Sequence, residues 1–593
     1  MYLFMYVHMY IYLYDKINCF RITTKTSFCW KHFAKIDGNS AKCNICGKTI
    51  KTAGNTTNMK DHLRNVHKIR EEDQTPVSNS GTPRQASIAA SFQNITDFGG
   101  EGQKTKKIND AIVYMIAKDI QPFSIVENAG FIYLMNTVAP RYEIPSRYKV
   151  TKWLDEKYSQ MKDLWRTRLT GKSISLTMDI WSDQMSMRSY LGITAHFLLE
   201  QEMSSLTIGA MQLSERHTGP YLSEMLEICC SDWNIDKKQV TAIVTDNGTN
   251  IKKAAEITFG PKIHLPCFAH TINLIARSAI QRESVNGCIA KTKSIVAFFN
   301  HSGVASDHLR KATDKVLIQD VPTRWNSTYY MIERFLEVKT QVNDILLSIP
   351  NDQMLLTGKE FELLNNVLTM LRPLEEATKI VSGDKYCTAS TVIPIVSIIK
   401  DKLEKLSDNT QEAKDMKEFL LLEIERRMGS IEQVSILAMA TLLDTRFKKL
   451  HFKDPVACAN ALMKIKSMFK ENESKEVIPP TTGNSDSFWN HHHQLAQCHN
   501  PNVDMDVEIS SYLRIPLTSF ESNPITVWES MKCTYPNLYK IAMQFLPVMG
   551  SSVPSERVFS AASNILCRKR NRMTPERLSR ILLLQSIDKK YFF

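Results

Sequence analysis

One stretch of this 593-residue chain, residues 173–270, alternates apolar and polar side chains in a way that constrains its fold. In residues 174–180 (ISLTMDI) the alternation has a period of two, which is typical of a β-strand buried on one face. Similar runs occupy residues 191–197 and 206–213, and a fully apolar run spans residues 240–244. Before that last run, apolar residues recur at the i, i+3, i+4, i+7 spacing of a helix, at Leu222, Met225, Leu226 and Cys229. Four strands with an intervening helix predict an α/β sheet.

Two acidic residues lie at strand ends in this stretch. Asp179 lies on the opposite face of its strand from Leu176, and Asp246 follows the apolar strand in the turn sequence Thr245-Asp246-Asn247-Gly248. Strands of one sheet can bring these two carboxylates together. Aspartates at strand ends are also common as caps and solvated turns, so the pair alone is a weak indication of a site.

A third acid, Glu556, lies near the C-terminus. Residues 555–559 (SERVF) open a predicted helix, directly after residues 546–548, where we expect the chain to return to the sheet. In the first turn its carboxylate lies against the positive end of the helix dipole, which favours the charged, metal-binding form. Two acids nearer in sequence, Glu333 and Glu337, are interpreted as part of a solvated helix face.

Cysteines and histidines near the N-terminal end follow the spacing C-x2-C-x15-H-x4-H. They are Cys43, Cys46, His62 and His67. Zinc takes four such ligands in a tetrahedron, and a short cysteine turn followed by a helix from about Thr57 would supply them. Leu63 and Val66 are expected to fill the small core under that helix. The alternative is two free cysteines and two surface histidines.

Basic residues accompany this pattern and the chain as a whole. Lys31, Lys60 and Arg64 would give the zinc module a positive surface for phosphate groups. Lys and Arg outnumber Asp and Glu by 74 to 62, a formal net charge of +12, which favours a polyanionic partner. Thirteen cysteines without a framework spacing favour a reducing compartment over a secreted disulfide scaffold.

The first residues, 1–14, form an apolar, tyrosine-rich run. It is shorter than the roughly 20 residues that a membrane span needs. It also lacks the basic start and the cleavage site of a signal peptide. We therefore expect residues 1–25 to be a disordered extension, and we expect no membrane partner.

The remaining chain divides by composition. Residues 71–103 are rich in Ser, Thr, Pro, Gln and Gly without a hydrophobic period, which predicts a flexible linker. Residues 104–168 return to helical patterning, and residues 281–535 are dominated by helix formers. The interval between Asp246 and Glu556 is far longer than a sheet requires, so we expect a large all-helical insertion within the α/β core.

Four sequence motifs carry a resemblance to a known family. They are Met178-Asp179-Ile180-Trp181-Ser182, Thr245-Asp246-Asn247, Cys267-x-x-His270 and Pro554-Ser555-Glu556-Arg557-Val558-Phe559-Ser560. In this order they resemble the hAT superfamily of cut-and-paste DNA transposases, and in particular its domesticated relatives, the zinc finger BED domain-containing proteins. The zinc pattern, with Trp30 and Phe33 upstream, resembles the DNA-binding BED finger. The resemblance covers nearly all of the chain after about Phe28.

The resemblance implies a multidomain α/β plus α fold. Its parts would be a BED-type finger (26–70), a helical DNA-binding or assembly domain (104–168), a ribonuclease-H-like core (169–280) interrupted by the helical insertion (281–535), and the end of the core with C-terminal dimerisation helices (536–593). For the helical domain, a simple brace on the core is an equal alternative. The apolar stripe at Ile581, Leu582 and Leu584 would hold a homo-oligomer together.

The resemblance also assigns an Asp-Asp-Glu triad to Asp179, Asp246 and Glu556. Such a triad would hold two Mg2+ ions about 3.5–4 Å apart and promote an in-line phosphodiester displacement. Carboxylate oxygens are the ligands that Mg2+ prefers.

Three smaller features keep more than one interpretation each. Trp325, in the motif Thr323-Arg324-Trp325-Asn326, would stack on a flipped base, or it is a core tryptophan. Cys267 and His270 are half of a metal site or a buried structural pair. The basic run Arg568, Lys569 and Arg570 contacts the DNA backbone, serves nuclear import, or is only solvated.

Two functions follow from these expectations. The first is a zinc-dependent nuclear DNA-binding protein, derived from a transposase and acting in transcription regulation. The alternative is an active transposase that cuts and joins DNA with the two-metal site. Domesticated relatives can keep the same three acids, so the triad does not decide between them.

Overall fold

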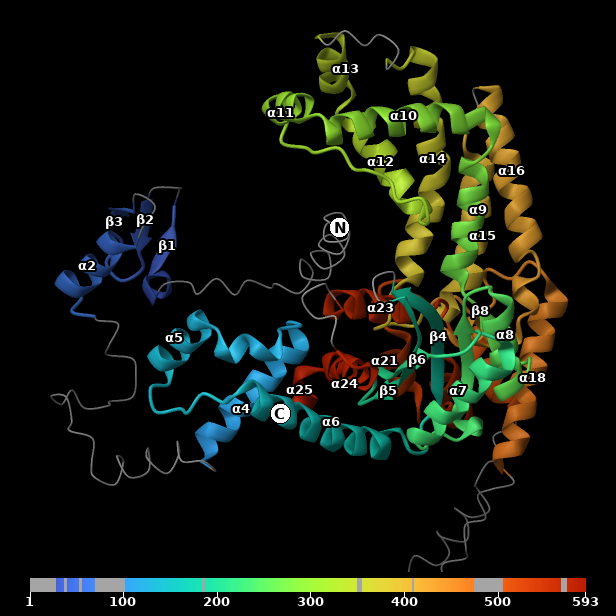
Figure 1. The fold of residues 1–593 in the computed structure, drawn as a ribbon, viewed down its shortest axis with the longest axis horizontal. Coiled ribbons are helices and arrows are strands. Elements are labelled where there is room, and N and C mark those ends of the chain that lie inside the picture. The colour runs from blue at the N-terminus through green and yellow to red at the C-terminus, as the bar shows by residue number, and fades with distance from the viewer. Residues whose placement is uncertain are drawn as a thin grey trace, which may run out of the picture. The chain divides into compact units, whose positions relative to one another are not determined.

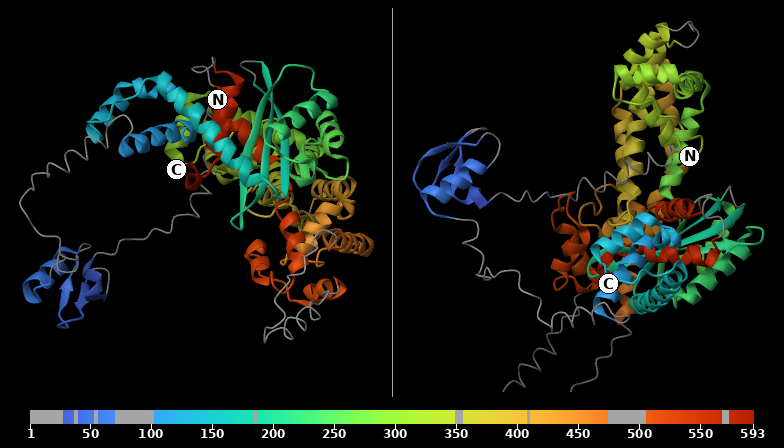
Figure 2. Two further views of the ribbon diagram at one scale, coloured as in Figure 1. Left: turned by 90° about the horizontal axis from the view of Figure 1, so that it is seen from below. Right: turned by 60° about the vertical axis from the view of Figure 1, so that its left-hand side comes forward.

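The computed structural model describes residues 28–36, 40–52, 56–69, 102–183, 187–348, 355–407, 410–473, 505–566 and 573–593 (Figures 1 and 2). The chain divides into two compact units, residues 1–99 and 100–593. The expected extension (1–25), nearly all of the expected linker, and the basic residues Arg568, Lys569 and Arg570 lie outside the described residues. Among the described helices, none combines the length and apolar character needed to cross a bilayer.

The first unit is a small sheet with one helix. A 3-10 turn (Phe28–Lys31) precedes the antiparallel strands β1 (Phe33–Lys35), β2 (Ser40–Cys43) and β3 (Thr49–Lys51), and α2 (Thr57–Val66) follows them. The helix directs Met59, His62 and Leu63 inward, at helical spacing. Leu63 is buried as expected, but the expectation for Val66 is wrong. It is the last residue of α2 and is 56% exposed, and Met59 fills the core in its place.

The second unit is built on a five-stranded sheet, which confirms the predicted α/β core. Its strands in spatial order are β6 (Glu202–Leu213), β5 (Arg188–Leu199), β4 (Ile174–Asp183), β7 (Val240–Thr245) and β8 (His264–Pro266). β6, β5 and β4 pair antiparallel, and β4, β7 and β8 pair parallel. Helices α7 (Gly219–Asp232) and α8 (Thr249–Phe259) flank β7 in the chain. The three-residue β8 was not among the predicted strands.

β4 is buried on both faces, contrary to the expectation of a half-buried strand. Its apolar side chains lie on the sheet face that α7 covers. Met178 pairs with Ile193 of β5 and Ile193 pairs with Gly209 of β6, where an added Cβ atom would lie 3.0 Å from Cys229 Sγ of α7. The other face carries Ser175 and Thr177, which are also buried. Helix α23 (Val553–Ile565) covers this polar face, and Ser555 Oγ donates a hydrogen bond of 2.9 Å to Thr177 Oγ1. The apolar and polar side chains of β4 therefore alternate as predicted, but helices cover both faces of the strand.

A glycine allows α23 to lie directly on the sheet beside Asp179. Gly192 of β5 pairs with Asp179 of β4, so the two residues face the same side. A Cβ atom at Gly192 would lie 2.4 Å from Cε1 of Phe559 on α23. The Phe559 ring stacks on Trp181 at 6.0 Å, and Trp181 stacks on Tyr190 at 5.4 Å. Any side chain at position 192 would displace this aromatic stack.

Between residues 281 and 535 the regular elements of the described residues are all helices, joined by loops such as residues 313–324. After α9 (Phe268–Ile280) the helices are α10 (Glu283–His301), α11 (Gly303–Ala312), α12 (Trp325–Glu337), α13 (Lys339–Ser348), α14 (Gly358–Val381), α15 (Val392–Lys405), α16 (Gln411–Met428), α17 (Ser435–Leu443), α18 (Pro455–Glu473), α20 (Met505–Arg514), α21 (Pro524–Met531) and α22 (Pro536–Phe545). In Figures 1 and 2, α9, α14, α15 and α16 extend side by side from the sheet toward α10–α13. One apolar core runs from Val244 of β7 into these helices.

Helix α24 (Pro575–Ser586), near the C-terminus, joins the sheet edge to the helices that precede the sheet. It packs on β6, on α4 (Gln103–Lys118) and on α6 (Arg147–Leu169). Arg580 Nη1 lies 2.6 Å from Asp155 Oδ1 of α6. The stripe expected to contact a partner chain, Ile581, Leu582 and Leu584, is instead buried inside this chain. An amphipathic helix needs an apolar partner surface, and here that surface is intramolecular.

We expect Gly192→Ala to destabilise the second unit by about 1–3 kcal/mol, because the added methyl overlaps the Phe559 ring. Phe559→Leu in the same chain should recover part of this loss, since it removes the overlapping ring carbon. Urea unfolding would measure both free energies. Gly287→Ala, where an added Cβ meets nothing within 4 Å, is the control. Equal stability of Gly192→Ala and the wild type would contradict the packing argument.

Candidate metal centre and acidic cluster

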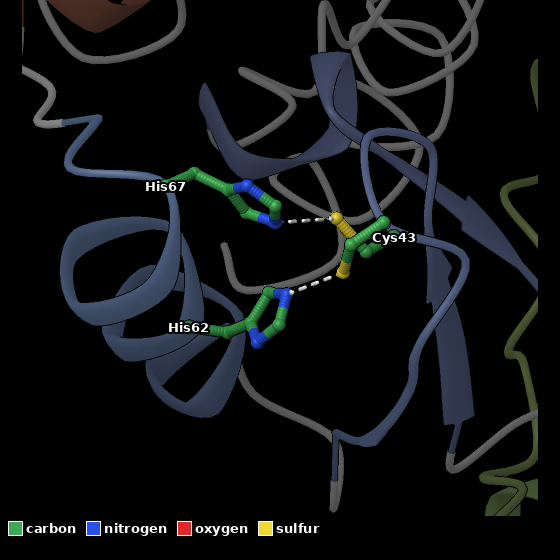
Figure 3. Close-up of side chains that lie close together, drawn as sticks. Cys43, His62 and His67 are labelled. Carbon is green, nitrogen blue, oxygen red and sulfur yellow. Dashed lines mark hydrogen bonds between the residues drawn. The ribbon is translucent and has the colours of Figure 1, made fainter.

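The four predicted zinc ligands converge in the first unit. Cys43 Sγ lies 3.4 Å from His67 Nε2, and Cys46 Sγ lies 3.3 Å from His62 Nε2. All four ligand atoms lie within 4.8 Å of one another. Figure 3 shows His62 and His67 pointing toward the cysteine sulfur atoms. Sulfur and nitrogen ligands at tetrahedral zinc are separated by about 3.5 Å, so this donor set fits the ion.

Local structure explains how the ligands meet. Cys43 ends β2, and a turn at Gly47, with a positive φ of 74°, reverses the chain toward β3. Within that turn Gly47 N donates to Cys43 O at 2.9 Å. His62 lies on the buried side of α2, whereas His67 is the residue that caps the helix. The histidine spacing therefore reflects one ligand within a helix and one at its end.

The protonation states in the finger suit a metal ligand set. Burial, followed by the charges of His67 and Lys48, lowers the pKa of His62, which favours the neutral imidazole that zinc binds. Burial acts to raise the pKa of the Cys43 thiol, but hydrogen bonds from the backbone of Cys46 and Ile45 outweigh it and lower that pKa. A lowered thiol pKa favours the thiolate.

The basic residues named from the sequence lie on the outside of the finger. Lys60 and Arg64 are one turn apart on the exposed side of α2, and Lys31 is also exposed. Asn58, at the start of the helix, donates its side-chain amide to Lys51 O at 2.8 Å. That bond occupies one donor of the Asn58 amide.

The second unit draws together the three predicted acids. Asp179 lies on β4, Asp246 follows the adjacent strand β7, and Glu556 lies in the first turn of α23. Desolvation raises the pKa of Asp179 to about 8, with additional contributions from the charges of Glu556 and Asp246. One oxygen of Asp179 accepts from Ile180 N at 2.8 Å, and one of Asp246 accepts from Gly248 N at 3.0 Å. We call these three residues the acidic cluster.

The acidic cluster is more open than the finger. Of the described residues, only the four finger ligands form a group of three or more His, Cys, Asp and Glu side chains close enough to hold an ion as they stand. Arg324 of the insertion also reaches the cluster, with its Nη2 atom 3.9 Å from Glu556 Oε2. Arg324 was not among the predicted site residues, although it adjoins Trp325 in the quoted motif.

Glu556 is positioned by the turn at residues 549–552, which we call the docking turn. Its groups bond to β4, to α9 and to the insertion. The bonds are Met549 N to Ser175 Oγ (3.3 Å), Gly550 N to Thr388 Oγ1 (2.9 Å), Phe268 N to Gly550 O (3.1 Å), Ser551 Oγ to Val381 O (2.6 Å) and Ser552 N to Cys267 Sγ (3.2 Å). The chain thus returns to the sheet after residues 546–548, as expected.

Cys267 serves as a helix cap. Its fully buried Sγ accepts from His270 N at 3.4 Å and from Ser552 N at 3.2 Å, which joins the start of α9 to the docking turn. Burial raises the pKa of this thiol and keeps it protonated. These contacts favour the structural interpretation of Cys267 and His270 over half of a metal site.

Trp325 is in the protein core in this structure. The side chain is 3% exposed, and its ring packs against Tyr329 at 6.2 Å. Trp325 N donates to Asn273 Oδ1 of α9 at 3.3 Å. A buried ring offers no free face to a nucleobase, so base stacking by Trp325 stays a prediction that requires the ring to leave this position.

For the finger we expect a fragment of residues 26–70 to bind one zinc ion and to unfold when a strong chelator removes it, because metal binding supplies the folding energy. Circular dichroism and metal analysis would measure both. Cys46→Ser should lose the ion. Cys29→Ser is the matched control, because Cys29 lies outside the ligand set. A metal-free fragment that keeps its structure would refute the assignment.

Comparison with family models matches four parts of the chain. They are the BED zinc finger (residues 27–68), the ZBED1 RNase-like domain (177–259), the ZBED1 RNase-like helical domain (265–370) and the hAT family C-terminal dimerisation region (508–586). The matches follow the order of the finger, the sheet, the insertion and the C-terminal helices described above.

Whole proteins show the same relationship. Zinc finger BED domain-containing protein 4 of Homo sapiens is 26% identical over 95% of this chain, and the chain spans about half (52%) of that relative. The putative AC transposase of Zea mays is 25% identical over 93% of this chain, and the aligned part is 74% of that relative's length. The putative transcriptional regulator tpeD of Talaromyces stipitatus is 23% identical over 95% of this chain and is 72% covered. The chain thus carries a BED zinc finger, RNase-like domains and an hAT C-terminal dimerisation region, and over most of its length it is similar to BED-finger proteins and to hAT-type transposases.

Proposed function

We propose that this protein is a nuclear, zinc-dependent DNA-binding protein that acts in transcription regulation. The observation that carries the proposal is the finger, where a zinc donor set on one side of α2 orients Lys60 and Arg64 on the exposed side. The chain's net charge of +12 and the family model of the BED zinc finger support it. The name of the fungal relative, a putative transcriptional regulator, supports the regulatory role.

The physical basis of binding is phosphate neutralisation. Lys60 and Arg64 are four residues apart, so their side chains extend from neighbouring turns of one helix face. Such a pair can contact successive phosphates while the opposite face of α2 is tied to the metal. Each contacted phosphate releases counterions, which makes the affinity fall with salt at a slope of about 0.9 per phosphate.

We expect Lys60→Ala and Arg64→Ala each to weaken DNA binding about 5- to 20-fold at moderate salt, and to lower the slope of log affinity against log salt by about one. Fluorescence anisotropy of the full chain, on a duplex selected from a random library, would measure this. Lys311→Ala, which removes an exposed charge from the insertion, is the control. An unchanged slope in the α2 variants would contradict the proposed interface.

A second candidate function is metal-dependent cleavage and joining of DNA by the acidic cluster. The favouring observation is the pKa of about 8 at Asp179, caused by desolvation and by two neighbouring carboxylates. Crowded carboxylates become fully charged when a divalent cation neutralises them, and their hard oxygens suit Mg2+. Mg2+ held there would activate the attacking oxygen and stabilise the leaving oxygen. The maize relatives are named putative transposases.

We expect Asp179→Asn to abolish Mg2+-dependent strand cleavage and to raise the stability of the cation-free chain by about 1–3 kcal/mol. The folded pKa of Asp179 exceeds its usual value, so charging it costs stability as pH rises from about 4 toward 8, and Asn removes this cost. Plasmid nicking and thermal melts at pH 7.5 would measure both. Glu337→Gln, an exposed acid of the insertion, is the control. Cleavage retained by Asp179→Asn would exclude the cluster as the active site.

We also propose that the protein self-associates, as the matched hAT dimerisation region suggests. Since the α24 stripe is buried internally, another surface must contact the second copy. Helix α5 (Ala129–Val138) carries no charge and no buried residue, and it exposes Tyr133, Leu134 and Val138. It lies in the chain between α4 and α6, both of which pack on α24 of that region. We assign the interface to α5.

We expect Leu134→Glu to halve the mass measured by light scattering, because the charge would be desolvated in an apolar interface. Val456→Glu makes the same change at an exposed apolar position of α18 and should leave the mass unchanged. If the Leu134→Glu variant still self-associates, α5 is not the interface.

A further inference from the structure

A line of buried polar side chains crosses the sheet beneath α23. Ser555 Oγ donates to Thr177 Oγ1 at 2.9 Å, and Thr177 Oγ1 lies 3.0 Å from His196 Nε2. His196 Nδ1 lies 2.9 Å from Ser205 Oγ, which donates to Asp384 O at 3.3 Å. We call this the polar line. It joins α23, β4, β5, β6 and the segment after α14.

The proton positions along the polar line follow from its last member. Asp384 O is a carbonyl oxygen and can only accept, so the Ser205 hydroxyl proton is directed to it. His196 must then donate from Nδ1 to Ser205, which leaves Nε2 of a neutral imidazole to accept from Thr177. Thr177 in turn accepts from Ser555. Every hydroxyl and both ring nitrogens are satisfied in this single arrangement.

The surroundings make this arrangement obligatory. Ser555, Thr177 and His196 are all fully buried. Burial lowers the pKa of His196 to about 4, with Asp384 opposing the shift and Arg557 adding to it, so the ring is neutral at physiological pH. A buried donor or acceptor that loses its partner costs about 1–3 kcal/mol, so removing one member disturbs its neighbours.

The Ser555 end of the polar line adjoins the acidic cluster. Ser555 immediately precedes Glu556, and Thr177 lies two residues before Asp179 on the same face of β4. The residue after Glu556 is anchored as well, since Arg557 Nη1 lies 3.1 Å from Asp384 Oδ1 and Nη2 donates to Ser382 O at 2.6 Å. Glu556 is therefore held between two attachments to the same part of the fold.

We propose that His196 is a positioning residue for the acidic cluster. By accepting the Thr177 hydroxyl proton, His196 orients Thr177 so that it accepts from Ser555. These bonds position the first turn of α23, which carries Glu556, next to Asp179 on β4. This inference rests on the proposed cation-binding role of the cluster. His196 is not near enough in sequence to any of the three acids to have been found by motif, and its connection is made only in the folded chain.

The test uses two substitutions at Thr177 in the full chain. Thr177→Val keeps the shape but removes the hydroxyl, whereas Thr177→Ser keeps the hydroxyl. We expect Thr177→Val to raise the Mn2+ dissociation constant about tenfold, by calorimetry, and to accelerate amide exchange in residues 553–557 about tenfold, by mass spectrometry. Thr177→Ser should restore both to within about twofold of wild type. Ser555→Ala, a smaller change at the end of the line, should act in the direction of Thr177→Val.

The outcomes separate this inference from the proposed function. Unchanged exchange in α23 of Thr177→Val would overturn the inference, because the line would not hold the helix. If Thr177→Val accelerates exchange in α23 but leaves the Mn2+ affinity unchanged, the polar line has only a structural role, and the inference is also overturned. A wild-type chain that binds no Mn2+ would remove the proposed cation site, and the positioning role with it.

Discussion

The arrangement of the second unit depends on the hydrogen bonds of the docking turn. Its main-chain and hydroxyl groups meet β4, the start of α9 and the insertion within four consecutive residues. Buried main-chain groups must be paired, so a shift of this turn by one residue would leave several of them unsatisfied at once. The place of α23, and with it Glu556, is therefore determined where the chain returns to the sheet, by bonds to β4, to α9 and to the insertion at Val381 and Thr388.

The polar face of β4 shows what this arrangement costs and what it provides. An apolar face under α23 would bury no group that needs a hydrogen-bond partner. On the polar face that is present, every buried hydroxyl and imidazole must find one. The chain instead buries Ser175, Thr177 and His196. The docking turn pairs with Ser175, α23 pairs with Thr177, and His196 pairs with Thr177 and Ser205 within the sheet. The Asp179 carboxyl, which lies next to this face, is partly removed from water, which raises its pKa and strengthens its response to a cation. Local rules are broken at this face, as is typical of functional sites.

The sequence predicts the elements well and their partners poorly. Period-two runs located β4, β5 and β6, a fully apolar run located β7, and cysteine and histidine spacing located the finger ligands, because these signals are local. The burial of the polar side of β4 could not be foreseen, since its cover, α23, lies hundreds of residues away. The stripe at Ile581, Leu582 and Leu584 correctly indicated a buried face, but periodicity does not say whether the covering surface belongs to the same chain. The expectation that Val66 is buried was wrong because Val66 is the last residue of α2. The strand β8 was missed because its three residues are too few to show a period.

The separation of the acidic cluster along the chain has a consequence for biosynthesis. Asp179 and Asp246 belong to one early segment, whereas Glu556 lies 310 residues beyond Asp246. At about 5–20 residues per second, a ribosome reaches Glu556 roughly 15–60 s after Asp246. Throughout that interval α23 has not been synthesised. The polar face of the nascent sheet is then uncovered, and Asp179 and Asp246 lack Glu556. A chain that terminates early therefore contains the complete ligand set of the finger but only two of the three acids of the cluster.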